Sequence, residues 1–194
     1  NVAFFVAGDL KTPPEAAAFV MGLGNAHYFT PEHQKEMSYY KCAELLGWNT
    51  IARRNIATLE ALKWGADIIV MVDDDNIPVD TSYVDHHVSA LSYPHFGVHA
   101  YGLGSWFDVG QLLDPSAPHR GFPHDQPALW TASPAVNARV GVNAGICLGD
   151  PDISAVTRIA RKPEVHRVSE LLQRGLTVDR HTWTVCNSQN TSFI

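Results

Sequence analysis

Residues 53–78 read RRNIATLEALKWGADIIVMVDDDNIP, and this stretch decides the predicted fold. A helical run closed by a glycine leads into an apolar strand over 67–72 that ends in three consecutive aspartates. Adjacent carboxylates repel one another, so the arrangement costs stability unless a cation lies beside them. We therefore expect a divalent metal ion at the end of this strand.

The helix predicted over 50–64 brings basic residues to the same place. If it packs antiparallel to the strand that follows, its about 15 residues at roughly 1.5 Å per residue nearly match the strand and its connection. Arg53 and Arg54 at its start then lie near the aspartates, at the carboxyl end of the sheet, where open α/β folds bind ligands. Asp9 and Lys11, just past the first strand, fall on this edge too.

Arg53 and Arg54 are themselves a signal for an anion. Cations in a first helical turn oppose the helix dipole by about 0.3 to 1 kcal/mol each, so acidic residues are usual there. A pyrophosphate held by the two arginines and free backbone N–H groups, and bridged by a metal to the carboxylates, satisfies both clusters. The alternative is that the arginines simply pair with the aspartates.

The type of ligand points to Mg²⁺ or Mn²⁺ rather than zinc, because carboxylate oxygens are hard donors. Alternate residues of an extended chain point the same way, so Asp73 and Asp75 act together while Asp74 points elsewhere. One carboxylate is a direct ligand and another binds through water or accepts from a ribose hydroxyl. We predict that Asp73 and Asp75 are the metal ligands. The residues predicted to bind the nucleotide-sugar are Asp9, Lys11, Arg53, Arg54, Asp73 and Asp74.

Strands and helices alternate along much of the chain. Further strands are predicted over 2–7, 97–101 and 182–186, and further helices over 31–46, 81–91, 151–161 and 163–174. Thr30 and Pro31 are typical of a helix start, and Gly47 and Gly65 of helix ends. The alternation indicates an α/β sandwich with a mostly parallel central sheet.

Composition limits the class of protein. With 194 residues the chain is long enough for one domain, and its 20 acidic against 14 basic residues argue against a nucleic-acid partner. No apolar run approaches the roughly 20 residues of a membrane span. Three scattered cysteines form no disulfide framework or zinc motif, so we expect a reducing, cytoplasmic location.

Residues 102–143 are rich in glycine, proline and aromatic residues, which is typical of loops. Flat apolar faces and polar groups that suit a sugar or a base come from Trp106, Phe107, Phe122, Trp130, Arg120, His124 and Asp125. The alternative is that these aromatic residues only pack the loops together.

Two acidic residues downstream are candidates for chemistry. Asp150 and Asp152 could orient an acceptor hydroxyl, although Asp150 is equally typical of a helix cap. The run Asp85-His86-His87 favours a solvated helix face, because adjacent helical side chains point about 100° apart and do not easily share a metal. His181 is the one late candidate for a histidine ligand.

Several of these segments together resemble a known family. The run 53–78 resembles the donor-binding half of a GT-A type glycosyltransferase, and the segments HRGFP, GVNAGICLGDPDI and NSQNTSF resemble the reversibly glycosylated polypeptides, the UDP-arabinopyranose mutases. The resemblance implies a GT-A (Rossmann-like) αβα sandwich forming a single catalytic domain over 1–194. In that family the arginine that matches Arg120 is associated with reversible sugar attachment, and a further arginine follows where this sequence has His124 and Asp125.

The resemblance implies a metal-dependent glycosyltransferase with a nucleotide diphosphate sugar donor, UDP-sugar foremost, and with mutase or self-glycosylating activity as an option. Its catalytic residues are predicted as Arg120, Asp150 and Asp152, and its partners as the nucleotide-sugar and a small-molecule or saccharide acceptor, with a homo-oligomer left open. Because the chain stops inside the last of these segments, we expect it to continue beyond Ile194.

Two alternatives remain. A sugar nucleotidyltransferase uses a related sheet, but usually has a glycine- and arginine-rich loop after its first strand, where this sequence reads GDLKTPPE. The other is a non-catalytic homologue that serves as a scaffold within a complex.

Overall fold

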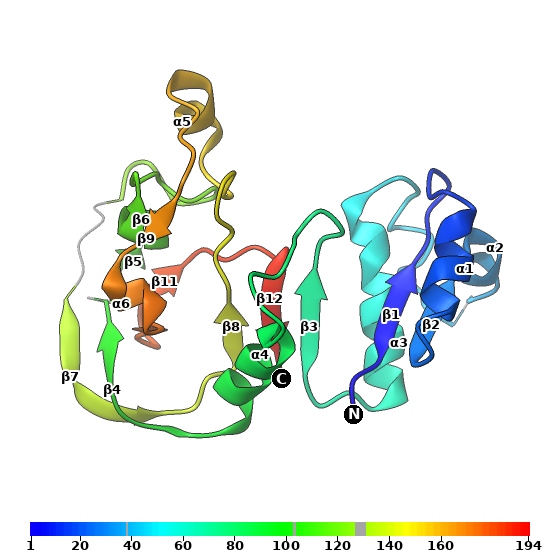
Figure 1. Ribbon diagram of the computed structural model, residues 1–194, viewed down its shortest axis with the longest axis horizontal. Helices are drawn as coiled ribbons and strands as arrows, with labels where there is room; N and C mark the ends of the chain where they lie inside the picture. Colours follow the sequence, from blue (N-terminus) through cyan, green and yellow to red (C-terminus); the bar gives the residue numbers. More distant parts are fainter. Residues whose placement is uncertain (38, 103, 127–130) are drawn as a thin grey trace. The chain divides into compact units, whose positions relative to one another are not determined.

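The computed structural model describes residues 1–37, 39–102, 104–126 and 131–194 (Figure 1). The chain forms two compact units, Asn1–Ile69 and Val70–Ile194. Both contain helices and strands, which confirms the mixed α/β class. The single catalytic domain over 1–194 stays a prediction.

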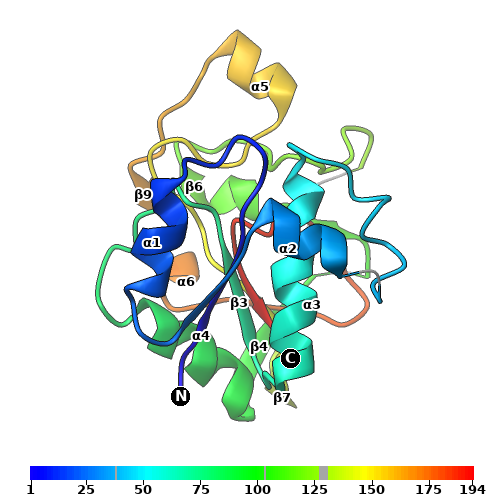
Figure 2. The same ribbon diagram turned by 90° about the vertical axis from the view of Figure 1, so that its right-hand side faces the viewer.

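The first unit is built on a pair of parallel strands. Its elements are β1 (Phe4–Ala7), α1 (Glu15–Met21), β2 (Ala26–Phe29), α2 (Pro31–Glu36), the 3₁₀ helix η1 (Ile51–Arg54) and α3 (Asn55–Trp64). The strands β1 and β2 pair in parallel from Phe4 opposite Ala26 to Ala7 opposite Phe29. Helix α1 packs against β2 and α3 against β1, on opposite sides of the pair (Figure 2).

Local signals set most element ends in this unit. The Thr30 side chain accepts a hydrogen bond from the His33 N–H at 3.2 Å, so it caps α2 as predicted. Gly65 ends α3 with φ 97°, a left-handed conformation that glycine adopts without steric cost. The helix predicted over 50–64 is present as η1 followed by α3, so Arg53 and Arg54 lie in a 3₁₀ turn before the α-helix.

The predicted helix over 31–46 is wrong in length, because α2 ends at Glu36. Met37 leaves the helix and is only 2% exposed, in a core cluster with Phe29 and Ile56. Turns follow up to Leu46. Burial of Met37 in this core outweighs the moderate helix propensity of the residues behind it.

Gln34 ties α2 to the carboxyl ends of both strands. Its side chain is 2% exposed, and Nε2 donates to Gly8 O at 2.6 Å and to Phe29 O at 2.7 Å. The two carbonyls follow β1 and end β2, so one side chain satisfies backbone acceptors of neighbouring strands.

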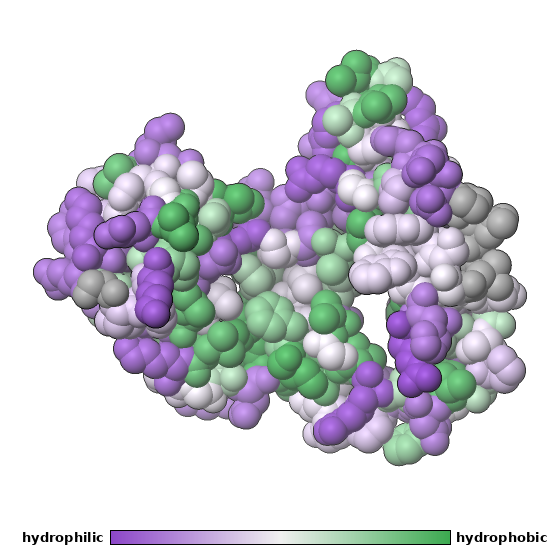
Figure 3. Space-filling view, turned by 180° about the vertical axis from the view of Figure 1, so that it is seen from behind, coloured by the Kyte–Doolittle hydropathy of each residue, from purple (hydrophilic) through white to green (hydrophobic). Residues whose placement is uncertain are grey.

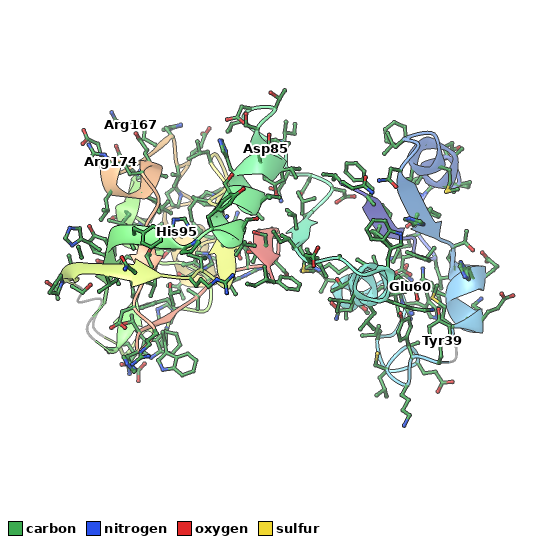
Figure 4. The ribbon with its side chains drawn as sticks, turned by 90° about the horizontal axis from the view of Figure 1, so that it is seen from below. Tyr39, Glu60, Asp85, His95, Arg167 and Arg174 are labelled. Atoms are coloured by element: carbon green, nitrogen blue, oxygen red, sulfur yellow. The ribbon has the colours of Figure 1, made fainter. Side chains whose placement is uncertain are left out.

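Glu60 on α3 holds the turns after α2. Its Oε1 accepts from Tyr39 OH at 2.8 Å and from Tyr40 OH at 2.7 Å, and Lys63 Nζ lies 3.7 Å away; Figure 4 shows Tyr39 and Glu60 together. Burial alone would raise the pKa of Glu60, but the hydrogen bonds from Tyr40 and Tyr39, with the charge of Lys63, outweigh it and lower that pKa. Burial and the same carboxylate raise the pKa of Tyr40, which stays protonated and donates.

The second unit, from Val70 on, holds several small sheets. Its elements, beginning at the boundary, are β3 (Ile69–Val72), α4 (Tyr83–Ser92), β4 (His95–Tyr101), β5 (Trp106–Phe107), η2 (Val109–Leu112), β6 (Leu113–Asp114), β7 (Ala132–Ala138), β8 (Val142–Ala144), α5 (Ala155–Ala160), β9 (Arg167–Val168), α6 (Glu170–Gln173), β10 (Thr177–Val178), β11 (Trp183–Thr184) and β12 (Asn190–Phe193). The strand orders are β3-β12-β8, β10-β4-β7, β11-β5 and β6-β9.

These sheets differ from the predicted mostly parallel central sheet. β4 pairs with β10 in parallel but with β7 antiparallel, and β12 pairs with β8 antiparallel. The described strands thus show small sheets of mixed orientation.

Three predicted elements near the C-terminus change their bounds. α5 starts at Ala155 because Ser154 caps it by accepting from Thr157 N–H at 3.2 Å. The helix predicted over 163–174 shrinks to α6, since the residues before it form β9 against β6. The last strand is β12 rather than 182–186, where only the short β11 forms.

His87 fastens α4 to the β3-β12-β8 sheet. Its ring is 3% exposed, with Nδ1 2.7 Å from Ser192 Oγ and Nε2 2.9 Å from Asn190 Oδ1. Burial lowers the pKa of His87, so the ring is neutral. The predicted solvated face is therefore wrong for His87, although Asp85 and His86 are exposed.

α5 projects from the body of its unit (Figures 1 and 2). Its inner side is held by Ser154 and Thr157, whereas Val156 and Ile159 are 65% and 87% exposed. Figure 3 shows the apolar residues at this tip. None of the described helices has the length and apolar character needed to span a bilayer.

The Glu60 cluster predicts a pH-dependent loss of stability. Glu60→Gln should lower the free energy of unfolding by about 1–3 kcal/mol at neutral pH, because the phenols lose a charged acceptor. The pKa of Glu60 is lowered in the folded state, so this stabilisation is complete above the ordinary value of 4.5 and is lost as the pH falls through the folded-state pKa. Urea unfolding from pH 7 to pH 3 measures both effects.

Glu44→Gln is the matched control, because Glu44 is exposed on the same turns. Equal stability of the Glu60 and Glu44 variants at neutral pH would contradict the assigned role of Glu60.

Candidate functional site

Three of the sequence segments meet at one edge of the β3-β12-β8 sheet. The Asp73 N–H donates to Gln189 O at 3.1 Å, and the Gly145 N–H donates to Asn190 O at 2.7 Å. The carboxyl ends of β3 and β8 therefore both lie beside the start of β12. We call this the acidic edge, defined by residues 73–76, 145–152 and 187–190.

Asn76 links these three segments. Its Nδ2 donates to Gln189 O at 3.2 Å, and its Oδ1 accepts from Cys147 Sγ at 3.5 Å. Its own N–H donates to Asp73 O at 3.2 Å and closes the turn after β3. The carboxamide fixes the loop that carries the aspartates, a role that the sequence reasoning missed.

The negative charges of the acidic edge converge on Cys147. Burial raises the pKa of this thiol, and the carboxylates of Asp152, Asp75 and Asp73 raise it further, in that order of size. Asp73 is half-buried and Asp75 exposed. The structure thus brings together three of the predicted acidic residues, two from the end of β3 and one from the loop after β8.

Asp152 is held by two donors. Arg120 Nε lies 2.8 Å from Oδ1, and Asn187 Nδ2 donates to Oδ2 at 2.9 Å. The side chain of Asp152 is 8% exposed and that of Arg120 is 62% exposed. The Arg120 N–H also donates to Asp152 O at 2.9 Å. Asp152 therefore orients Arg120, whose side chain is largely exposed.

Asp150 lies apart from this pair. Its carboxylate pairs with Arg158 on α5, and 70% of its side chain is exposed. The helix-cap interpretation of Asp150 is wrong, because Ser154 caps α5. Asp150 instead stabilises the first turns of α5 through Arg158, while its predicted catalytic role stays a prediction.

The basic residues of the predicted site belong to the first unit. Arg53 is 4% exposed, its guanidinium donates to Gly47 O, and it stacks 3.9 Å from the centroid of the Trp48 ring. This fixes the turn before η1, a structural role that the sequence did not reveal. Arg54 beside it is half-buried and also engaged.

Asp9 also has a structural role in the first unit. Its Oδ1 accepts from the Leu10 N–H at 2.7 Å and its Oδ2 from the Asn49 N–H at 2.8 Å, so it ties the loop after β1 to the turn before η1. Lys11 is exposed. Joint binding of a nucleotide-sugar by these residues and the aspartates stays a prediction.

The aromatic residues of the loop region pack in the second unit. Trp106 makes an edge-to-face contact with Phe122 at 6.2 Å between centroids, and its ring lies 6.2 Å from that of Trp183. Phe107 is fully buried. These contacts favour the packing interpretation for Phe107 and Phe122. Trp130, the fourth predicted aromatic, lies outside the described residues.

His181 is exposed, and its Nε2 is 2.9 Å from Arg180 Nε. Its role as a metal ligand stays a prediction. His124 and Asp125, near Arg120 in the sequence, are exposed as well.

The donor set suits a hard cation that arrives with its ligand. No group of three His, Cys, Asp or Glu side chains that could hold a metal occurs within the described residues. Mg²⁺ commonly binds through one or two carboxylates together with water and substrate phosphates, rather than in an all-protein cage. Asp73 and Asp75 fit that manner of binding, because they place two carboxylates at the acidic edge. Both carboxylates raise the pKa of the Cys147 thiol.

The comparisons with known proteins identify no relatives. No protein-family model matches the chain, and no curated protein matches its sequence.

The convergence of charge predicts a change in thiol reactivity. Asp152→Asn removes the charge that raises the pKa of Cys147 most among the carboxylates, so the thiolate fraction at fixed pH should rise. The rate of iodoacetamide alkylation at Cys147, followed by peptide mass spectrometry to separate it from Cys42 and Cys186, measures this fraction. Asp150→Asn is the control. An unchanged alkylation rate in Asp152→Asn would show that the carboxylate does not act on the thiol.

Proposed function

We propose that the protein is a metal-dependent glycosyltransferase that uses a nucleotide diphosphate sugar, UDP-sugar foremost. The observation that carries the proposal is that Asn76 joins the loop of Asp73 and Asp75 to Gln189 and Cys147. At the same edge Asn187 holds Asp152, the partner of the exposed Arg120. A negative edge with one oriented arginine suits a divalent cation and a diphosphate together, because each ion compensates charge that the other leaves.

The chemistry needs positioning and electrostatic stabilisation rather than a covalent protein intermediate. An acceptor hydroxyl oxygen bonds to the anomeric carbon of the donor sugar as the bond from that carbon to the diphosphate oxygen breaks. The diphosphate leaves with the electron pair and takes up the proton that the hydroxyl loses. Asp73 and Asp75 would hold Mg²⁺ or Mn²⁺, which would supply Lewis-acid stabilisation of the leaving group. Arg120, oriented by Asp152, donates to the same developing charge.

Transfer to a separate acceptor is proposed ahead of self-glycosylation or mutase activity. His124 and Asp125 stand where the resembled family has a second arginine after the segment of Arg120. A GT-A type αβα sandwich is the fold proposed with this function, and the parallel pair β1–β2 supports it. A reducing, cytoplasmic location is proposed as well, in keeping with the free thiols of Cys42, Cys147 and Cys186.

The proposal predicts metal-dependent donor binding that needs Asp75. Titration calorimetry with UDP-glucose, UDP-galactose and UDP-arabinopyranose in Mn²⁺ should give a binding isotherm for at least one donor, lost without the metal. Asp75→Asn should weaken it at least tenfold, because a carboxylate ligand becomes a neutral amide. Asp80→Asn, an exposed aspartate on the same loop, is the control.

Unchanged affinity in Asp75→Asn would contradict the metal role of this residue. If no nucleotide-sugar binds with Mn²⁺ or Mg²⁺, the glycosyltransferase proposal fails. The alternative of a non-catalytic scaffold protein is then favoured.

A further inference from the structure

A cavity of about 320 Å³ lies in the second unit beside η2. Its lining includes Asp108, Gly110, Ala117, Phe122, His124 and Arg161. The volume is at the small end of the roughly 300–1,000 Å³ found for small-molecule pockets. It therefore suits a ligand of about monosaccharide size.

Asp108 is a buried residue whose carboxylate lines the cavity. Its residue is 2% exposed, and Oδ1 accepts from the Gly110 N–H at 2.9 Å and the His119 N–H at 3.1 Å. Among the described residues no group donates to Oδ2, and Asp108 lines the cavity. Burial raises the pKa of this carboxyl, and the backbone hydrogen bonds from His119 and Gly110 offset that only in part. Oδ2 therefore keeps acceptor capacity on the cavity side, and a hydroxyl donor bound in the cavity would use it.

The other walls of the cavity combine an apolar surface with the cation Arg161 and the polar ring of His124. Phe122 and Ala117 are 8% and 1% exposed, and Trp106 packs against the Phe122 ring. Arg161 is exposed, and its Nη2 donates to Ser116 O at 3.2 Å. His124 is exposed at the same cavity.

This combination favours a neutral polyhydroxylated ligand. The carbon face of a sugar ring packs on apolar side chains while its hydroxyl groups donate and accept hydrogen bonds. A carboxylate or phosphate ligand is disfavoured at the inner end, because Asp108 would repel it. A purely apolar ligand would leave Oδ2 of Asp108 unsatisfied.

We propose that this cavity binds a neutral monosaccharide unit, with Asp108 Oδ2 accepting from a sugar hydroxyl and Arg161 donating to another. His119, whose N–H binds Asp108, is adjacent in the chain to Arg120, which binds Asp152. One loop therefore joins the cavity to the acidic edge. The role of this site as the acceptor subsite rests on the proposed glycosyl transfer, whereas sugar binding itself does not.

The test is a titration of the ¹⁵N-labelled protein with glucose, galactose, xylose and arabinose, followed by amide NMR. At least one sugar should shift the Gly110 and His119 amide signals in a saturable way. Asp108→Asn keeps an oxygen for both backbone N–H groups but replaces the free acceptor by an NH₂ donor, so affinity should fall at least tenfold. Asp114→Asn is the control, because Asp114 is exposed and paired with Arg167.

A second variant keeps the test valid should Asp108→Asn fail to fold. Arg161→Gln changes an exposed side chain and should weaken the same sugar at least threefold. Absence of saturable shifts at Gly110 and His119 for all four sugars overturns the proposal. So does full affinity in a folded Asp108→Asn, or in Arg161→Gln.

The outcomes for the two proposals are separable. Sugar binding at Asp108 without any binding of UDP-sugar and Mn²⁺ would support the cavity and remove the transferase. Binding of UDP-sugar and Mn²⁺ without monosaccharide binding at Asp108 would leave the transferase standing and overturn the cavity.

Discussion

Repulsion among the carboxylates at the acidic edge is the constraint on which the functional interpretation depends. Asp73 and Asp75 follow directly on β3, and Asp152 comes from the loop after β8, yet all three act on the same thiol. Arg120 and Asn187 hold Asp152 in place. Such a gathering of like charge is stable only when further positive charge or solvent compensates it, and in the proposed function a divalent cation would supply that positive charge.

The fold was predictable where a single local signal decides an element. Thr30 before Pro31 and the left-handed Gly65 set the ends of their helices as expected. Elements that depend on distant partners were missed. The sequence of β12 is polar, yet Thr191 and Ser192 are buried, and Ser192 Oγ lies 2.7 Å from Nδ1 of His87 on α4. No periodicity within β12 could reveal that contact.

The acidic residues of the candidate site were predictable from the sequence. The polar residues that position them were not. The position of Asp73 and Asp75 after an apolar strand is visible in the sequence, since strand ends carry ligands in open α/β folds. The roles of Asn76 and Asn187 depend on carbonyl and carboxylate partners more than 30 residues away, so spacing carries no trace of them. For Arg53 the sequence signal was misleading. Its charge suggested an anion site, whereas its guanidinium stacks on the Trp48 ring and stabilises the turn there.

Paramagnetic broadening by Mn²⁺ in the presence of UDP tests the central claim most directly. In amide NMR spectra, signals of residues 73–76, 145–152 and 187–190 should broaden at substoichiometric Mn²⁺, and Mg²⁺ in excess should restore them. Broadening centred on any other segment, or none with UDP present, would contradict a metal and diphosphate site at the acidic edge.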